Sequence, residues 1–154
     1  MGKRLKLYLL IPSIIVLGFI RDYLFENINW VYLTHTTQRR NQARPEFHFL
    51  LDWTPDQILN LKWFGTVLFY LLFLGLTLLI IHLAFKNRTF NFITLGMFAG
   101  LFGISGLLYI AGWVSGYGNQ LYGAIHTIMM IAQSFVPLMI LAILFNFLPS
   151  SQSD

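Results

Sequence analysis

The sequence predicts an all-α, polytopic membrane protein, a four-transmembrane-helix bundle with one longer polar loop between the first and second helices. Two observations carry this prediction. Of 154 residues, 56% are hydrophobic and only 10% are charged, whereas soluble domains carry about 25% charged residues. Three apolar stretches, 61–85, 90–114 and 121–148, exceed the roughly 20 residues that cross a bilayer. A fourth, shorter stretch lies near the N-terminus.

The charge and the cysteine count exclude several classes of function. The net charge is +4, and no basic stripe typical of nucleic-acid binders is present, so no nucleic-acid partner is expected. Cysteine is absent, which excludes thiol catalysis, thiolate metal sites and disulfides. The spacing of the four histidines matches no metal-ligand motif. We therefore expect neither a metal nor a cofactor.

The first predicted helix runs from about residue 5 to residue 26. No A-x-A-like cleavage site follows its apolar run, so we interpret it as a retained anchor rather than a signal peptide. Between Lys6 and Arg21 lie fourteen residues, or about 21 Å of helix, which is too short to cross the hydrocarbon. The helix therefore carries Arg21 and Asp22 into the outer part of the membrane and continues past them.

Two polar stripes on membrane helices are candidates for chemistry. Asp22, Glu26 and Asn29 share one face of the first helix. His126, Met130, Gln133 and Pro137 share one face of the last helix. His126 lies near the outer end of that helix, at about the same predicted depth as Arg21. Asp22 or Glu26 could meet His126 in a pocket under the outer leaflet and serve proton transfer or headgroup binding. The alternatives are solvated carboxylates and a histidine that joins two helices.

The predicted outer loop, about 27–54, contains three arginines: Arg39, Arg40 and Arg44. Together with Arg21 they could hold phosphate or carboxylate groups bidentately, although a solvated loop is the simpler explanation. The aromatic segment "FHFLLDW" at the end of this loop is expected to lie on the membrane surface.

The second predicted helix, about 55–85, begins with a strong local signal. In "TPDQ", Thr54 suits the N-cap, Pro55 the first helical position, and Gln57 completes a capping box. The helices at about 90–114 and 121–148 follow the short segments "KNRT" and "SGYGNQ". These short connections predict antiparallel helix pairs within a single membrane domain, 1–154.

Two sets of small or polar residues mark possible helix contacts. Gly96, Gly100 and Gly103 fall on one narrow face of the third helix, which lets another backbone approach closely. Packing within the bundle is the simpler explanation, and a helix of another protein is the alternative. Gln133 and Ser134, near the bilayer middle, would line the path if the chain formed an oligomeric channel or transporter.

The orientation prediction rests on basic residues near helix ends. With the N-terminus inside, the residues that face the cytoplasm are Lys3, Arg4, Lys6, Lys86 and Arg88. The first helix usually dominates orientation. We therefore expect both termini in the cytoplasm.

Several segments together resemble a known family. They are an anchor helix that passes into "RDYLF", a polar loop with "RPEF", a long helix ending "LLIIHLAFKNR", and a last helix "AQSFVPLMILAILF". This arrangement resembles the small four-helix membrane proteins encoded beside bacterial exosortases, which are membrane-embedded sorting transpeptidases. The exosortase itself is excluded because its nucleophile is a cysteine. The resemblance implies the bacterial cytoplasmic (inner) membrane and an accessory role in surface-protein sorting or envelope assembly.

The expected function is that of a non-enzymatic accessory or scaffold subunit of such a complex. Its partners would be the lipid bilayer and another integral membrane protein, such as an exosortase. Motifs of hydrolases, phosphate-binding loops and zinc proteases are absent, which favours this reading. The alternative is a lipid- or headgroup-handling enzyme that uses Asp22, Glu26 and His126.

Overall fold

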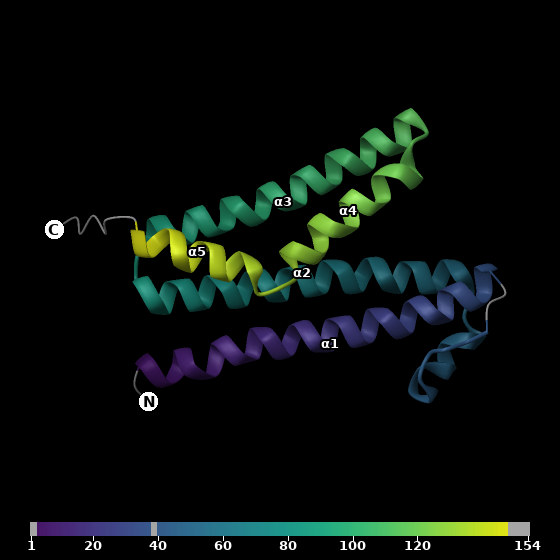
Figure 1. Ribbon diagram of the computed structural model, residues 1–154, viewed down its shortest axis with the longest axis horizontal. Coiled ribbons are helices and arrows are strands. Elements are labelled where there is room, and N and C mark those ends of the chain that lie inside the picture. Colours follow the sequence, from purple (N-terminus) through teal and green to yellow (C-terminus); the bar gives the residue numbers. More distant parts are fainter. Residues whose placement is uncertain (1–2, 38–39, 148–154) are drawn as a thin grey trace. The chain divides into compact units, whose positions relative to one another are not determined.

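The computed structural model describes residues 3–37 and 40–147, and every element assigned within them is helical (Figure 1). In chain order these are α1 (Lys3–Thr37), the 3-10 helix η1 (Pro45–Asp52), α2 (Pro55–Phe85), α3 (Arg88–Ser115), α4 (Gly118–Ala132) and α5 (Val136–Phe147). The chain forms two compact units. One comprises Val16–Phe69 and the other the residues before and after it. Helices α1 and α2 each contribute to both units.

Two of the described helices, α2 and α3, are each long and apolar enough to cross a membrane. The pair α4 and α5 also passes this test if it counts as one bent span, which makes two or three candidate spans. Many large apolar side chains on these helices are exposed, as Phe64, Phe92 and Leu107 illustrate. Lipid rather than water would suit such surfaces. A fourth crossing, by α1, stays a prediction.

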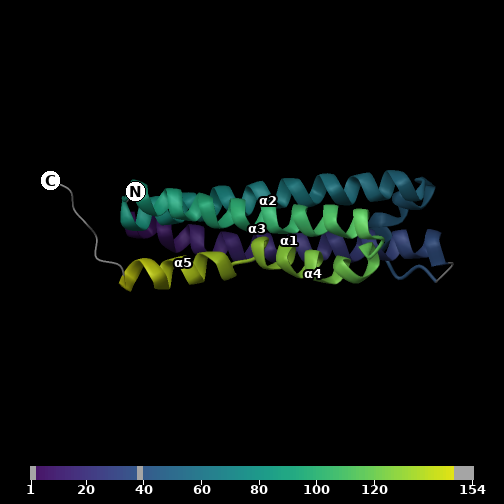
Figure 2. The same cartoon turned by 90° about the horizontal axis from the view of Figure 1, so that it is seen from above.

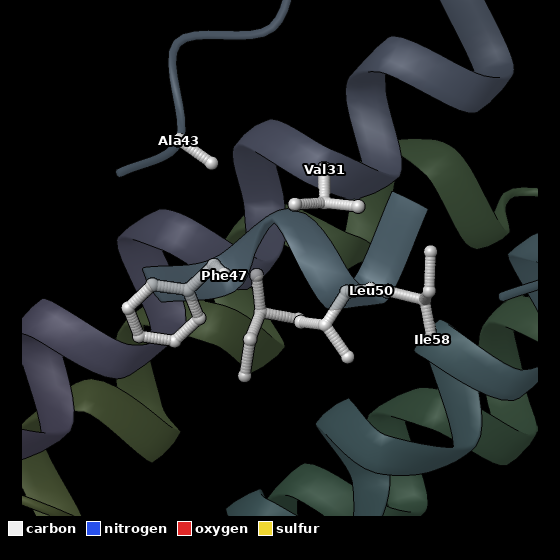
Figure 3. Packing of buried hydrophobic residues seen from close by; sticks show 6 residues of the cluster. Val31, Ala43, Phe47, Leu50 and Ile58 are labelled. Atoms are coloured by element: carbon white, nitrogen blue, oxygen red, sulfur yellow. The ribbon is translucent and has the colours of Figure 1, made fainter. Parts of the chain in front are cut away.

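The unit formed by Val16–Phe69 has its own hydrophobic cluster, shown in Figure 3. The buried members come from α1, the loop, η1 and α2, and they are Ile28, Val31, Ala43, Phe47, Leu50 and Ile58. This cluster explains why α1 extends to Thr37 instead of ending near residue 26 as predicted. Apolar side chains beyond residue 26 have a packing partner in η1, so the polar sequence around them remains helical.

The start of α2 confirms the predicted capping box. The Thr54 N–H donates to Gln57 Oε1 at 2.9 Å, and the Gln57 N–H donates to Thr54 Oγ1 at 3.3 Å. Pro55 occupies the first helical position, where its missing N–H costs no hydrogen bond. The bounds of α2 coincide with the predicted range, 55–85.

In the other unit, α2 and α3 are joined by the tight turn predicted from "KNRT". Lys86 has a φ of 50°, and the Asn87 side chain caps α3 by accepting from the Thr89 N–H at 2.8 Å. Beside the turn, Phe90 stacks on Phe145 of α5 with ring centroids 4.1 Å apart. Phe85 packs edge-on against both rings, so this aromatic triad joins α2, α3 and α5.

The last predicted helix, 121–148, is broken into α4 and α5, which differ in direction by 59° (Figures 1 and 2). Pro137 explains the break. It has no N–H to donate to the carbonyl of Gln133, and its ring clashes with that carbonyl in a continuous helix. Ser134 Oγ replaces part of the lost bonding, since it accepts from the Val136 N–H and donates to the Ile131 carbonyl.

Helices α3 and α4 form a close hairpin, with Gly116 at φ 76° as the C-cap of α3. A Cβ added at Gly112 would lie 3.1 Å from the Cα of Gly118. The absence of a side chain at Gly112 therefore lets the two helices approach closely where the hairpin begins.

Candidate functional site

The predicted polar stripe on α1 lies on one continuous helix but faces outward. Asp22 and Glu26 are both exposed, and Asn29 is half-buried. The buried face of α1 is instead the one that carries Asn27, Ile28 and Val31. A meeting of these carboxylates with another helix stays a prediction, and the described contact of Asp22 is with the neighbouring Arg21.

Arg21 balances the charge of Asp22 locally. Its Nη1 donates to Asp22 Oδ1 at 2.6 Å, with the arginine side chain 9% exposed and the aspartate 65% exposed. The Arg21 guanidinium also lies 5.2 Å from the ring centroid of Phe25, within the range of a cation–π contact. Because Arg21 pairs with its neighbour in sequence, Asp22 can remain at the surface without an interhelical partner.

Asn27 is buried and organises a network of partly buried groups that the sequence pattern did not predict. Its Nδ2 donates to the Tyr23 carbonyl at 2.7 Å, and its Oδ1 accepts from the Arg44 N–H at 2.8 Å. The Arg44 guanidinium lies 5.7 Å from the Tyr23 ring centroid, and that ring packs edge-on against Phe47. The Asn27 side chain of α1 thus fixes the position of Arg44, the residue that precedes η1. Asn27 lies four residues after Tyr23 and four before Val31, on the same face of α1. This spacing is the sequence signal that could have indicated that Asn27 is buried.

The structure describes two of the three loop arginines, Arg40 and Arg44, and gives them different surroundings. Arg39 lies outside those residues, Arg40 is exposed, and Arg44 packs on the Tyr23 ring. A phosphate or carboxylate site built from Arg21, Arg39, Arg40 and Arg44 stays a prediction. Within the described ranges, no group of three or more histidine, aspartate or glutamate side chains is arranged to hold a metal ion.

His126 is exposed on α4, where its ring lies 6.0 Å from the ring of Tyr122, one turn earlier. It belongs to the unit that contains α3, α4 and α5, whereas Asp22 and Glu26 belong to the other unit. The predicted meeting of these carboxylates with His126 stays a prediction. The described ring neighbour of His126 is Tyr122 on the same helix.

Gln133 and Ser134 lie at the break between α4 and α5. Gln133 is buried and ends α4, and its backbone N–H donates to the Met129 carbonyl at 3.0 Å. Ser134 is half-buried and bonded to the backbone on both sides of the break. Both residues therefore stabilise an interrupted helix, and a role in lining a channel stays a prediction.

The predicted glycine face of α3 is exposed. The buried residues of α3 lie on the opposite face and are Phe90, Thr94, Phe98, Ser105 and Gly112. The Tyr70 hydroxyl donates to the Phe98 carbonyl and joins that face to α2. Gly100 follows Phe98 by two residues, and so lies roughly 200° around the helix.

Apart from the adjacent residues and the backbone of α3 itself, no described atom lies within 4 Å of a Cβ placed at Gly96, Gly100 or Gly103, and Gly106 is equally open. These glycines therefore do not pack against another described helix of this chain. The predicted packing of these glycines within the bundle is therefore not seen in the described residues, and a contact with a helix of another protein stays a prediction. Gly112 is the contrasting case, because it does pack within the chain.

The fold and these surfaces place the protein in the class of helical proteins whose apolar helices could span a membrane. No family model matches the chain, and no curated protein or solved structure is significantly similar to it.

Replacing Asn27 by alanine is expected to loosen the loop from α1. The change leaves the Arg44 N–H without its partner, which costs about 1–3 kcal/mol. Cleavage by trypsin after Arg40 should then accelerate roughly five- to a hundredfold, since proteolysis follows the population of the open form. The control is Asn29→Ala, which removes a side-chain amide from a half-buried position two residues away. This variant should leave the rate of cleavage by trypsin unchanged. Equal acceleration in both variants would show that the Asn27 bonds do not hold the loop.

Proposed function

We propose that this protein is a non-enzymatic accessory or scaffold subunit of a larger membrane complex that sorts surface proteins or assembles the cell envelope. It would cross the bacterial cytoplasmic membrane four times, with both termini in the cytoplasm. The partner would be another integral membrane protein, such as an exosortase. The single observation that carries this proposal is the open glycine face of α3.

The chemistry of that face favours a protein helix over lipid. Small residues are enriched where membrane helices meet, because a close approach of two backbones gains van der Waals contact over a large area. Gly96, Gly100 and Gly103 recur along the exposed side of α3 at spacings of four and three residues, each about one helical turn. In the apolar window of α3, only 17% of residues are buried, compared with 33% for α2. Helix α3 therefore has the larger surface left for a partner.

Purification from the native membrane in a gentle detergent, followed by mass spectrometry, tests the proposal. We expect a stoichiometric membrane partner in the wild type. In Gly100→Leu, overpacking between the helices costs about 1–3 kcal/mol, which lowers the retained partner roughly tenfold or more. The matched control is Gly75→Leu, because Gly75 is also exposed, helical and free of neighbours within 4 Å. That variant should keep the partner.

Two outcomes would contradict the proposal. A wild-type protein that purifies alone from the native membrane would remove the basis for an accessory role. Full retention of the partner by folded Gly100→Leu would show that α3 does not provide the contact surface. Circular dichroism of each variant establishes that the helices are intact before the comparison is made.

A further inference from the structure

A shallow groove lies at the start of α2, next to the end of η1. Its volume is about 420 Å³, and the residues that line it are Trp53, Gln57, Asn60, Leu61 and Phe64. This volume lies within the range of about 300–1,000 Å³ typical of sites for small molecules. All five residues belong to the Val16–Phe69 unit, so the groove is formed within one compact part of the chain.

The lining of the groove changes from polar to apolar along α2. The amides of Gln57 and Asn60 lie in its first two turns, and Leu61 and Phe64 follow. From Gln57 to Phe64 the helix rises about 10 Å. The Gln57 amide oxygen already accepts from the Thr54 N–H, and its NH₂ group remains a donor. Along α2 the groove thus offers two amide donors and then two apolar side chains, and Trp53 adds an aromatic side chain from the segment before the helix.

The position of the groove along α2 indicates which class of ligand could bind there. Helix α2 is a candidate membrane span of 31 residues, longer than the roughly 20 residues that the hydrocarbon requires. The first turns of α2 would then lie at the level of the headgroups. Exposed aromatic side chains surround this end of the helix, with Phe49 edge-on against Trp53 and with Trp63 on α2. Aromatic residues of this kind are enriched at membrane interfaces.

We propose that this groove binds one membrane glycerophospholipid. The ester carbonyls of the lipid accept hydrogen bonds from the Gln57 and Asn60 amides, and the first part of an acyl chain packs on Leu61 and Phe64. A phospholipid presents polar esters directly above apolar methylenes, which is the order of groups found along the groove. The proposal rests on α2 crossing the membrane and does not depend on the accessory role.

Native mass spectrometry of the full chain tests this site. The protein is purified in dodecylmaltoside and titrated with palmitoyl-oleoyl-phosphatidylethanolamine as the probe. We expect a single phospholipid adduct at low lipid concentration. In Asn60→Trp the indole fills the groove and the adduct should be lost. In Asn60→Leu the donor is removed and binding should weaken about tenfold. The control is Leu59→Trp, because Leu59 is exposed but does not line the groove.

Retention of the adduct by Leu59→Trp together with its loss from Asn60→Trp supports the site. Equal adducts in all variants would mean adventitious lipid from the micelle only, and would overturn the proposal, as would the absence of any adduct in the wild type. If a groove variant such as Asn60→Trp loses the lipid but retains the protein partner, the lipid site and the α3 surface act independently. A wild type with lipid but without a protein partner would contradict the accessory role alone.

Discussion

Leu50→Ala is expected to lower the free energy that holds η1 against α1 and α2 by about 3 kcal/mol. Leu50 is 1% exposed and lies among Val31, Phe47 and Ile58. Truncating a fully buried leucine removes its apolar contacts and leaves a cavity, which costs about 2–5 kcal/mol. The opening of η1 should become on the order of a hundredfold more frequent, because each 1.4 kcal/mol corresponds to a factor of ten.

Hydrogen–deuterium exchange of the full chain in micelles measures this opening. The reporter is the Trp53 N–H, which donates to the Leu50 carbonyl at 3.1 Å. Leu59→Ala is the matched control, because Leu59 is 38% exposed on α2, and it should change exchange at Trp53 little. If exchange in Leu50→Ala matched the wild type, the cluster would not hold η1, and the shape of the groove at Trp53 would need another explanation.

Phe145→Ala is expected to destabilise the other unit by about 3 kcal/mol. Phe145 is 2% exposed and contacts the rings of Phe90 and Phe85. Truncations of buried phenylalanine cost about 3–5 kcal/mol in water-soluble proteins. We expect the lower end because α4 and α5 together form a candidate membrane span. In lipid, which is as apolar as the side chains, the cost of truncation comes mainly from lost packing.

An equilibrium titration from dodecylmaltoside into sodium dodecyl sulfate, followed by circular dichroism, measures this loss. Phe147→Ala is the control. Phe147 lies on the same helix but is 83% exposed, and its truncation should change the free energy of unfolding by no more than about 0.5 kcal/mol. A similar loss in both variants would show that the aromatic triad does not join α5 to α2 and α3.

Local signals in the sequence were the most reliable guides to the fold. The range of α2 and its capping box were predicted correctly, since both depend on residues within one turn, Thr54 to Gln57. The turn at Lys86 and Asn87 is likewise a local event. Such features depend on backbone groups close in the chain, and no distant contact is needed to decide them.

Features that depend on distant contacts were predicted less well. The end of α1 was placed near residue 26, although the helix continues to Thr37 because η1 packs against its last turns. The last helix was predicted as continuous, although Pro137 breaks it. A proline in a membrane helix is tolerated when neighbouring groups satisfy the freed backbone, so the residue type alone does not decide between a kink and a break.

The candidate sites divide in the same way. The glycine face of α3 and the carboxylates on α1 were identified from helical spacing, which depends only on the order of residues. Whether Gly100 or Asp22 faces the interior depends on which side of each helix its neighbours cover. Asn27 shows the same limit, since its role comes from Arg44, seventeen residues away. The sequence by itself determined the helices and their apolar character, because these follow from local hydrogen bonding and hydrophobicity. Only the tertiary structure decided which faces are covered, because burial depends on contacts between residues far apart in the chain.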